Sequence, residues 1–324
     1  MWYRWTLKPL APFTQWPTSD LLMGQLAWAY RDCHSEASMR SWLDQFREQT
    51  PPFVVSDAWL EDTLPRPAGS SYTRARWSET DKAGRIQALE DRKRWKASRL
   101  LTYQEFWAVV GGQGDENQTF ETPRPHTVSV HTVHTGVDRI TGGARDGELF
   151  TREGWWSSAR LQIYIWSEPN SEVEMLARVL SYQGIGGEIS SGFGQVEWVE
   201  GREWEWPSVA EANGEVWLGH GVPTVNAPMD GFYHLHTKYG RVWGPQHPSP
   251  WKVPILQVQP GAVWHTKEPW KGWAGRALSE IHESPEVIDF GYTVTVPMRL
   301  PNAEAQEDVN LEDLNYGRNR VYTE

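Results

Sequence analysis

A glycine-rich segment in the middle of the chain constrains the fold most, because it separates a helical pattern from a strand pattern. Five glycines fall within eleven residues, in the run Gly184-Ile185-Gly186-Gly187-Glu188-Ile189-Ser190-Ser191-Gly192-Phe193-Gly194. Glycine serves where the backbone takes positive φ or approaches a ligand closely. Backbone N–H groups left uncovered by side chains, with two serine hydroxyls beside them, suit an anion such as a phosphate. The segment therefore predicts either a phosphate-binding loop or a flexible connection without a ligand.

The sequence on either side gives this loop a direction. Ser171 and Glu174 make a capping-box pattern followed by apolar residues at helical spacing, so residues 171–183 predict an amphipathic helix that ends at Gly184. Residues 193–199 carry a strand pattern. Dinucleotide and triphosphate loops run from a strand into a helix, whereas this loop runs from a helix into a strand and no Gly-Lys-Ser/Thr follows it. The order argues against both nucleotide-binding folds.

Apolar periodicity gives an element order for the first 200 residues. The expected elements are a strand at 2–7, a helix at about 20–31 capped by Ser19, a helix at about 36–48, and strands at 128–133, 161–165 and 193–199 around the 171–183 helix. Residues 51–70 are expected to be extended or looped, and residues 136–150 to be turns. A β-α-β-β-α-β order with large insertions is ferredoxin-like, so the expected fold class is α+β.

The last third of the sequence reads mostly as strands. They are expected at 215–219, 253–258, 262–266 and 289–296, with a hairpin of 233–238 and 241–243 that turns at Tyr239-Gly240. Residues 301–324 are polar and mostly acidic, and we expect this tail to be ordered only against a partner. The expected organisation is two tandem ferredoxin-like modules: an N-terminal domain at 1–200 with an insertion at about 60–125, a β-rich domain at 201–300, and the tail.

Composition limits the classes of partner. The chain has 324 residues and a formal net charge of −11, which argues against a general, nonspecific nucleic-acid binder but leaves room for local basic patches. Its 21 tryptophans fit core and interface packing or base stacking on single-stranded nucleic acid, and packing is the commoner use. The single cysteine, Cys33, excludes an internal disulfide and a cysteine-rich zinc site. Because we find no signal-peptide pattern and no long apolar run, we expect a soluble, cytoplasmic protein.

No sequence pattern for catalysis or metal binding stands out. His131 and His134 lie an odd number of positions apart, so a strand would send them to opposite faces. His234 and His236 share a face but have no third ligand near them in the sequence. A Ser-His-Asp order, His-Glu-x-x-His and Gly-x-Ser-x-Gly are absent. We therefore expect no catalytic residue, metal, cofactor or small-molecule substrate.

One segment runs against the acidic balance of the chain. Residues 81–99 are dense in charge, helical in propensity and net basic. Most charge runs are solvated helix faces. A net-basic insertion in an acidic protein is also a candidate for an arm that contacts RNA, so both interpretations stay open.

Four segments, in the same order along the chain, resemble one known family. The pattern Gly-x-Gly-Gly-x-x-Ser-x-Gly-Phe-Gly between a helix and a strand resembles the glycine-rich loop of the RAMP proteins, the RNA-binding subunits of CRISPR effector complexes. Residues 16–30, 53–67 and 134–150 are similar to successive segments of the type III-A (Csm) subunit that holds the 5′ end of the guide RNA. The matches span most of residues 1–200, and the last third matches more loosely.

The resemblance implies a RAMP fold, which is ferredoxin-like (RRM-like), and a noncatalytic RNA-binding subunit of a type III CRISPR interference complex. Such a subunit anchors the 5′ repeat-derived handle of the guide RNA and links the large polymerase-like subunit to the backbone filament. The implied partners are therefore guide RNA, the large subunit and the backbone RAMP subunit, and not a membrane. The implied RNA-contacting residues are Ser19, Asp20, Gly24, His134, Arg139, Arg145, Gly184, Gly186, Gly187, Ser190, Ser191, Gly192, Phe193 and Gly194.

Glu188 departs from the family pattern, which usually has a basic residue in the middle of the loop. An acidic side chain there would repel phosphate unless it points away or pairs with a cation. We therefore expect the backbone of the loop to bind RNA more than its side chains do.

Two other functions stay open. RAMP-fold endoribonucleases that mature guide RNA use histidine, and His34, His131 or His134 could serve in that way. The related backbone subunit cuts target RNA with a loop aspartate, and Asp32 lies at a comparable place. The third interpretation is a tryptophan-rich carbohydrate-binding β module, which the ordered motifs and the basic segment disfavour.

Overall fold

The computed structural model describes residues 1–69, 98–112, 127–169, 172–227, 230–242, 249–266 and 268–300, together with residues 86, 90 and 93. The predicted basic arm at 81–99 lies largely outside these residues, and the predicted tail at 301–324 lies outside them altogether. Among the described residues, no helix is long and apolar enough to cross a membrane.

The first sheet has the ferredoxin-like strand order. Its strands are β1 (Trp2–Pro9), β2 (Phe53–Val55), β8 (Leu161–Ser167) and β9 (Val196–Glu203), in the order β2-β8-β1-β9, with β3 (Trp59–Leu60) also on β8. Every neighbouring pair is antiparallel. The helices of this unit are α1 (Ser19–Cys33), α2 (Glu36–Arg47) and α5 (Val173–Gln183). The predicted α+β, ferredoxin-like class is confirmed.

The second strand of the ferredoxin-like order is not the predicted one. We expected it at 128–133, whereas the sheet uses β2, a strand of three residues that are all buried. Three buried residues show no alternation of apolar and polar side chains, so the sequence pattern could not distinguish them from a loop. The prediction that Ser19 caps α1 was also wrong, because Thr18 takes the N-cap position and Ser19 is the first helical residue.

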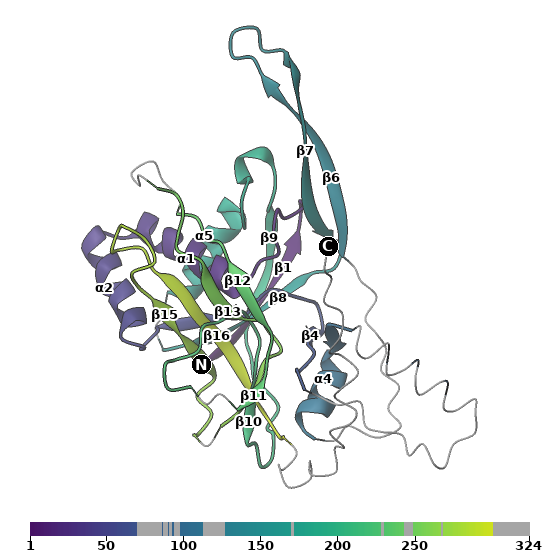
Figure 1. The fold of residues 1–324 in the computed structure, drawn as a ribbon, viewed down its shortest axis with the longest axis vertical. Coiled ribbons are helices and arrows are strands. Elements are labelled where there is room, and N and C mark those ends of the chain that lie inside the picture. Colours follow the sequence, from purple (N-terminus) through teal and green to yellow (C-terminus); the bar gives the residue numbers. More distant parts are fainter. Residues whose placement is uncertain are drawn as a thin grey trace, which may run out of the picture.

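A long hairpin occupies the place where we expected turns. Strands β6 (Thr127–Val137) and β7 (Ala144–Ser157) pair along nearly their full length, and Figure 1 shows them extending away from the rest of the chain. The turn itself takes only residues 138–143, where the Asp138 carboxylate accepts the N–H groups of Ile140 and Thr141. The prediction of turns over 136–150 was wrong because most of β7 is exposed and therefore lacks the apolar alternation of a half-buried strand.

Shorter elements complete the region between β2 and β8. Strands β4 (Thr63–Pro65) and β5 (Leu100–Thr102) pair with each other. Helix α4 (Tyr103–Val110) follows, with a capping box formed by Thr102 and Glu105. Helix α5 begins after Glu172 without a side-chain cap, and Ser171 of the predicted capping box lies outside the described residues.

The last third forms a second antiparallel sheet. Its strands are β10 (Gly214–Trp217), β11 (Gly231–Phe232), β14 (Val263–His265), β15 (Trp273–Leu278) and β16 (Asp289–Met298), in the order β11-β14-β10-β16-β15. Strand β12 (Leu235–Lys238) pairs with β13 (Ile255–Val258) and not with residues 241–243, so the predicted hairpin at Tyr239-Gly240 was wrong. Arg241 instead forms an isolated β-bridge with Trp251. The connection between the paired strands β12 and β13 is therefore longer than the predicted turn at Tyr239-Gly240.

One hydrophobic core joins the two sheets. Strand β16 is buried along its whole length, and its alternate residues Phe290, Tyr292, Val294, Val296 and Met298 belong to the same cluster as the apolar residues of β1 and α1. Phe46 of α2 packs its ring 4.9 Å from that of Phe290, which places α2 against the second sheet. The division into domains at residue 200 stays a prediction.

Most of the described tryptophans pack within the chain. Those that are buried are Trp5, Trp42, Trp59, Trp217, Trp264 and Trp273, and those that are partly buried against the core are Trp2, Trp16, Trp107, Trp166, Trp198, Trp204 and Trp206. Packing, which is the commoner of the two uses predicted for the tryptophans, therefore accounts for these residues. A tryptophan-lined carbohydrate surface would need many more of them exposed.

Candidate nucleic-acid interface

The glycine-rich loop is closed at its base by backbone hydrogen bonds. Ile185 N–H donates to Gly194 O at 2.7 Å, and Gly194 N–H donates to Pro12 O at 2.8 Å. Gly194 has φ +68°, and a Cβ there would lie 1.9 Å from Ile185 O, so only glycine fits. The side chains of Ile185 and Phe193 are buried beneath the loop. The segment is therefore a shaped loop and not a flexible connection.

Several N–H groups of the loop already have partners inside the protein. Gly186 N–H donates to Gln25 Oε1 at 2.9 Å, and the Gln25 amide donates back to the carbonyl groups of Gly184 and Gly186. The N–H groups of Ser191, Gly192 and Phe193 bond to carbonyl groups of residues 188 and 189, the start of the 3₁₀ turn η1 (Ile189–Ser191). Within the described residues, the N–H groups of 187–190 have no partner, so an anion could bind only there.

Gln25 is a residue that the sequence did not single out. It lies next to Gly24 on α1, and its side chain ties the helix to the loop by three hydrogen bonds. An amide side chain suits this position because it donates and accepts at once. A glutamine in a helix has no distinctive pattern, so only the spatial neighbourhood reveals it.

Glu188 pairs with a cation from the hairpin. Arg152 Nη1 lies 2.7 Å from Glu188 Oε1, and Glu188 takes a left-handed backbone conformation with φ +58°. Pairing with a cation is one of the two arrangements, beside pointing away, that make an acidic residue in the loop compatible with a phosphate nearby. The Arg152 guanidinium also lies over the Phe150 ring, 5.2 Å from its centroid.

An aromatic row continues from the loop along the hairpin. The rings of His134 and Phe150 are stacked at 5.5 Å with 14° between their planes, and the Phe193 ring lies 6.0 Å from His134. Phe193 covers Gly154, where an added Cβ would lie 2.9 Å from Phe193 Cε1. We call Thr132, His134, Phe150, Arg152 and Gly154 the inner hairpin face, because these residues point to one side of β6 and β7 by register.

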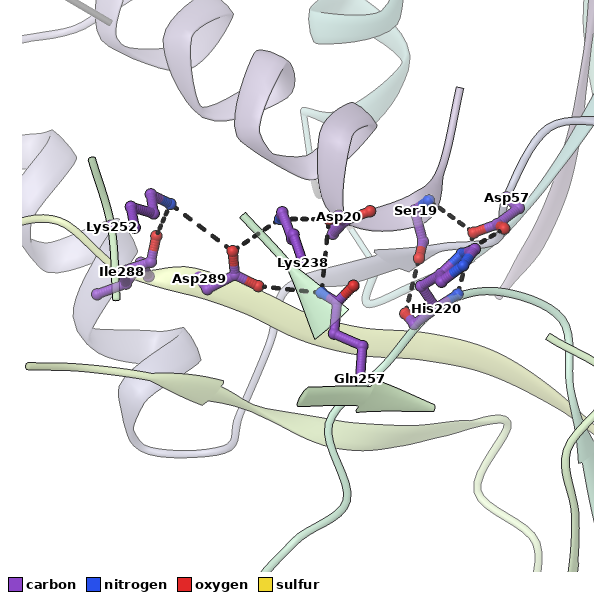
Figure 2. A network of polar contacts seen from close by, with 9 residues as sticks. All are labelled: Ser19, Asp20, Asp57, His220, Lys238, Lys252, Gln257, Ile288 and Asp289. Atoms are coloured by element: carbon purple, nitrogen blue, oxygen red, sulfur yellow. Dashed lines mark hydrogen bonds and ion pairs between the residues drawn. The ribbon is translucent and has the colours of Figure 1, made fainter. Parts of the chain in front are cut away.

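Ser19 and Asp20 do not lie on this surface, which corrects their predicted contact with RNA. Both are buried at the start of α1, as Figure 2 shows. The Asp57 carboxylate accepts the N–H of Ser19 at 2.7 Å and the N–H of His220 at 3.0 Å. The Ser19 hydroxyl donates to His220 O at 2.8 Å, and His220 Nδ1 donates to Asp57 Oδ2 at 2.8 Å. These contacts join α1 to the second sheet.

A buried ion network continues from Asp20 (Figure 2). Lys238 bridges Asp20 and Asp289, and Lys252 contacts Asp289 at 3.7 Å. Burial alone would raise the pKa of Asp20, but Lys238 outweighs burial and holds the pKa well below its ordinary value. Burial would lower the pKa of Lys238, but Asp20 and Asp289 hold it above its ordinary value. Gln257 donates to both carboxylates, and the two lysines compensate their charges.

The remaining residues that were predicted to contact RNA lie on the hairpin and on α1. Arg139 and Arg145 lie at the tip of the hairpin, and Arg145 pairs with Glu148 at 3.3 Å and with Asp138 at 4.0 Å. The loop contacts the hairpin at Arg152, so both arginines lie further along the hairpin than the loop does. Gly24 lies within α1, beside Gln25.

The candidate ribonuclease residues are not brought together. His34 pairs with Glu172 at 2.9 Å, Asp32 accepts from Gln183 at 3.1 Å, and His131 lies on the outer side of the hairpin. Among the residues that the structure describes, no group of three or more His, Cys, Asp or Glu side chains could hold a metal ion.

Comparisons with known proteins bear on the fold. The sequence matches no protein-family model and no curated protein. A chain of the Csm1–Csm4 cassette bound to cA4 superposes with a TM-score of 0.59 at 16% identity, over 93% of this chain and 99% of that one. A chain of the same cassette with pppApA gives 0.58 at 15% identity, over 93% and 100%. A chain of the Csm3–Csm4 subcomplex of the type III-A CRISPR–Cas interference complex gives 0.55 at 14% identity, over 93% and 100%.

The chain therefore shares its fold with chains of these Csm1–Csm4 and Csm3–Csm4 assemblies, which is the fold that its sequence resemblance implied. The likeness extends over nearly the whole length of those solved chains, so it includes the second sheet as well as the ferredoxin-like unit.

The first prediction concerns His220. Burial alone would lower the pKa of His220, but Asp57 outweighs burial and raises it above 6.5. The His220–Asp57 pair thus contributes stability that is fully present below the unfolded pKa of about 6.5 and is lost as pH rises through the folded pKa. We expect the free energy of unfolding of His220→Gln, measured in urea, to approach the wild-type value as pH rises through this window.

His131→Gln is the matched control, because His131 is exposed on the hairpin. It should leave the pH dependence of unfolding unchanged. If His220→Gln and wild type differ by the same free energy at every pH, the pair does not titrate in this way.

The second prediction concerns Gly24. An added Cβ there would meet nothing within 4 Å, and the residue lies inside a helix. Gly24→Ala is therefore expected to raise the free energy of unfolding by about 0.5–1 kcal/mol. Gly272→Ala is the opposite case, since its Cβ would lie 2.6 Å from Trp2 and φ is +93°. A denaturant titration that finds Gly24→Ala neutral or destabilising would contradict this.

Proposed function

We propose that this chain is a noncatalytic RNA-binding subunit of a type III CRISPR interference complex, and that it anchors the 5′ handle of the guide RNA. The observation that carries the proposal is the run of four uncovered N–H groups at 187–190, beside the arginine and aromatic side chains of the inner hairpin face. The fold supports it, because the similar solved chains come from two assemblies that both contain Csm4.

The arrangement suits single-stranded RNA for a physical reason. Proteins grip such RNA by donating hydrogen bonds to phosphates and by stacking aromatic side chains on splayed bases. The loop offers the donors, and Phe150 with His134 offers the aromatic surface within reach of the same loop. The chain carries a net charge of −11, so binding would depend on this local site and not on general attraction to phosphate.

The noncatalytic assignment rests on the separation of the candidate residues. General acid–base cleavage needs two groups within hydrogen-bond reach of one scissile phosphate. His34 and Asp32 are each bonded to a residue of the α5 region, and His134 is held in the aromatic row with its Nε2 2.9 Å from the Thr132 hydroxyl. We therefore place the endoribonuclease below the binding function.

The proposed protein partners have a surface on the second half of the chain. Leu235, Tyr239, Trp251, Val253 and Leu256 are all exposed apolar residues on or beside β12 and β13. Exposed apolar groups that gather in this way mark interaction surfaces, and aromatic residues are favoured in them. We propose that this patch, which we call the β12–β13 patch, contacts either the large polymerase-like subunit or the backbone RAMP subunit.

The third prediction tests the loop. Gly187→Val places a branched side chain on the uncovered segment at a position whose φ is not positive, and the added Cβ, 3.2 Å from Thr14 Oγ1, requires only a small shift of that side chain. We expect guide RNA retention to fall by roughly 10-fold or more, because each hydrogen bond to a charged group contributes about 1.5–3 kcal/mol. The measurement is the affinity of the purified chain for labelled guide RNA, with the thermal midpoint recorded to confirm folding.

Gly192→Ala is the matched control within the same loop. Its N–H already donates to Ile189 O at 3.0 Å, and an added Cβ there meets nothing within 4 Å, although φ is +88° and the substitution therefore strains the backbone. RNA affinity per folded molecule should change much less than for Gly187→Val. Equal effects of the two changes, or no effect of Gly187→Val, would remove the 187–190 segment from the site.

The fourth prediction tests the β12–β13 patch. The Leu256 side chain is 55% exposed, so Leu256→Asp should leave the fold intact. It should weaken copurification of a neighbouring effector subunit by at least roughly 10-fold, because a charge would be buried in the contact without a partner. Guide RNA affinity of the isolated chain should not change.

Met175→Asp on α5 is the control, since Met175 is also an exposed apolar residue but lies away from β12 and β13. Retention of every neighbouring subunit by Leu256→Asp would show that the β12–β13 patch is not the interface.

A further inference from the structure

The Arg152–Glu188 ion pair joins the inner hairpin face to the glycine-rich loop. Both side chains are about one-third exposed, so water and ions reach the pair. Exposed ion pairs of this kind are weak, because water screens the attraction and two long side chains lose freedom. A pair that contributes little to stability can be exchanged for a better partner without unfolding the loop.

A phosphate is a better partner for Arg152 than Glu188 is. The guanidinium has five N–H donors in a planar fork that matches two phosphate oxygens. The contact with Glu188 is a single short one, between Nη1 and Oε1 at 2.7 Å. The uncovered N–H groups of 187–190 lie on the same loop as Glu188, so a phosphate there would receive donors from both sides.

The ring of Phe150 lies directly beside the Arg152–Glu188 ion pair. Phe150 and Arg152 lie two residues apart on β7, hence on one side of the hairpin, and the guanidinium now lies over the ring. Phe150 is 43% exposed and is stacked with His134, which supports it from the opposing strand. When Arg152 turns toward a phosphate, it uncovers a ring surface on which a nucleobase can stack.

We propose that Phe150, His134 and Arg152 form a subsite for one nucleotide of single-stranded RNA, and that Glu188 blocks this subsite until a phosphate displaces it from Arg152. The subsite rests on the proposed function, because it assumes that the chain binds RNA at this loop. It assigns Glu188 the role of an internal competitor, which explains an acidic residue in a loop that faces phosphate.

The test measures the affinity of the full chain for a fluorescein-labelled single-stranded RNA. Phe150→Ala and Arg152→Ala should each weaken binding by roughly 10-fold. Glu188→Gln keeps the size of the side chain and removes the competing charge, so it should tighten binding by roughly 3-fold. In the Arg152→Ala background, Glu188→Gln should have no further effect, because the competitor then has nothing to block.

Stacking is read separately with an RNA that carries 2-aminopurine, whose fluorescence falls when the base stacks. Wild type should quench it and Phe150→Ala should not, whereas Phe150→Trp should restore the quenching. Inorganic polyphosphate, which has no bases, should compete for Arg152 but not depend on Phe150. Leu149→Ala is the control on the outer side of the same strand. Glu174→Gln is the control for removal of an acidic partner, because Glu174 pairs with Arg178 at 2.9 Å on α5.

The outcomes separate the subsite from the proposed function. If wild type binds the RNA but Phe150→Ala and Arg152→Ala bind equally well, the subsite is wrong and the function stands. If Glu188→Gln weakens binding, Glu188 supports the site and is not a competitor. If wild type binds no RNA, the proposed function fails and the subsite fails with it.

Discussion

Buried carboxylates on the N-terminal half of the chain determine how the two sheets are joined. Asp20 and Asp57 lie in the interior, and each takes its compensating partner from the last third of the sequence. A buried carboxylate without a partner is costly. The placement of α1 therefore depends on β12, β13 and β16, and the glycine-rich loop depends in turn on α1 through Gln25. Through these contacts, the last third of the chain fixes the position of the candidate RNA-binding loop.

The loop shows how much of a site the sequence can reveal. The glycine pattern correctly located a loop between a helix and a strand, but it left open whether this loop is a phosphate-binding loop or a flexible connection. It could not tell which N–H groups are free, since that depends on Gln25 and Pro12, which lie far away in the chain. The family resemblance implied that Ser19 and Asp20, at the start of α1, contact RNA, whereas the structure buries both. Their partners, His220 and Lys238, lie about two hundred residues later.

The fold was predictable where apolar periodicity was strong and failed where it was weak. Strands β1 and β8 and helices α2 and α5 were placed within a few residues, because their apolar residues recur in the sequence at strand or helical spacing. Strand β2 was missed because three buried residues have no period, and β7 because its outer part has no buried face. Strand β15 was missed because glycine, arginine and alanine interrupt its apolar pattern. Where apolar periodicity was too weak to indicate an element, the likeness of the structure to solved chains at 14–16% identity still identified the fold.

The long separations within the network have a consequence for synthesis of the chain. Asp20 and Gln257 are 237 residues apart, and Asp57 and His220 are 163 apart. While the ribosome is still producing the last third, Asp20 and Asp57 lack the residues that cover them and compensate their charge. Contacts of such large sequence separation form late and slowly. The glycine-rich loop would therefore reach its final shape only after β16 has been made, so that a nascent chain could not yet hold an RNA.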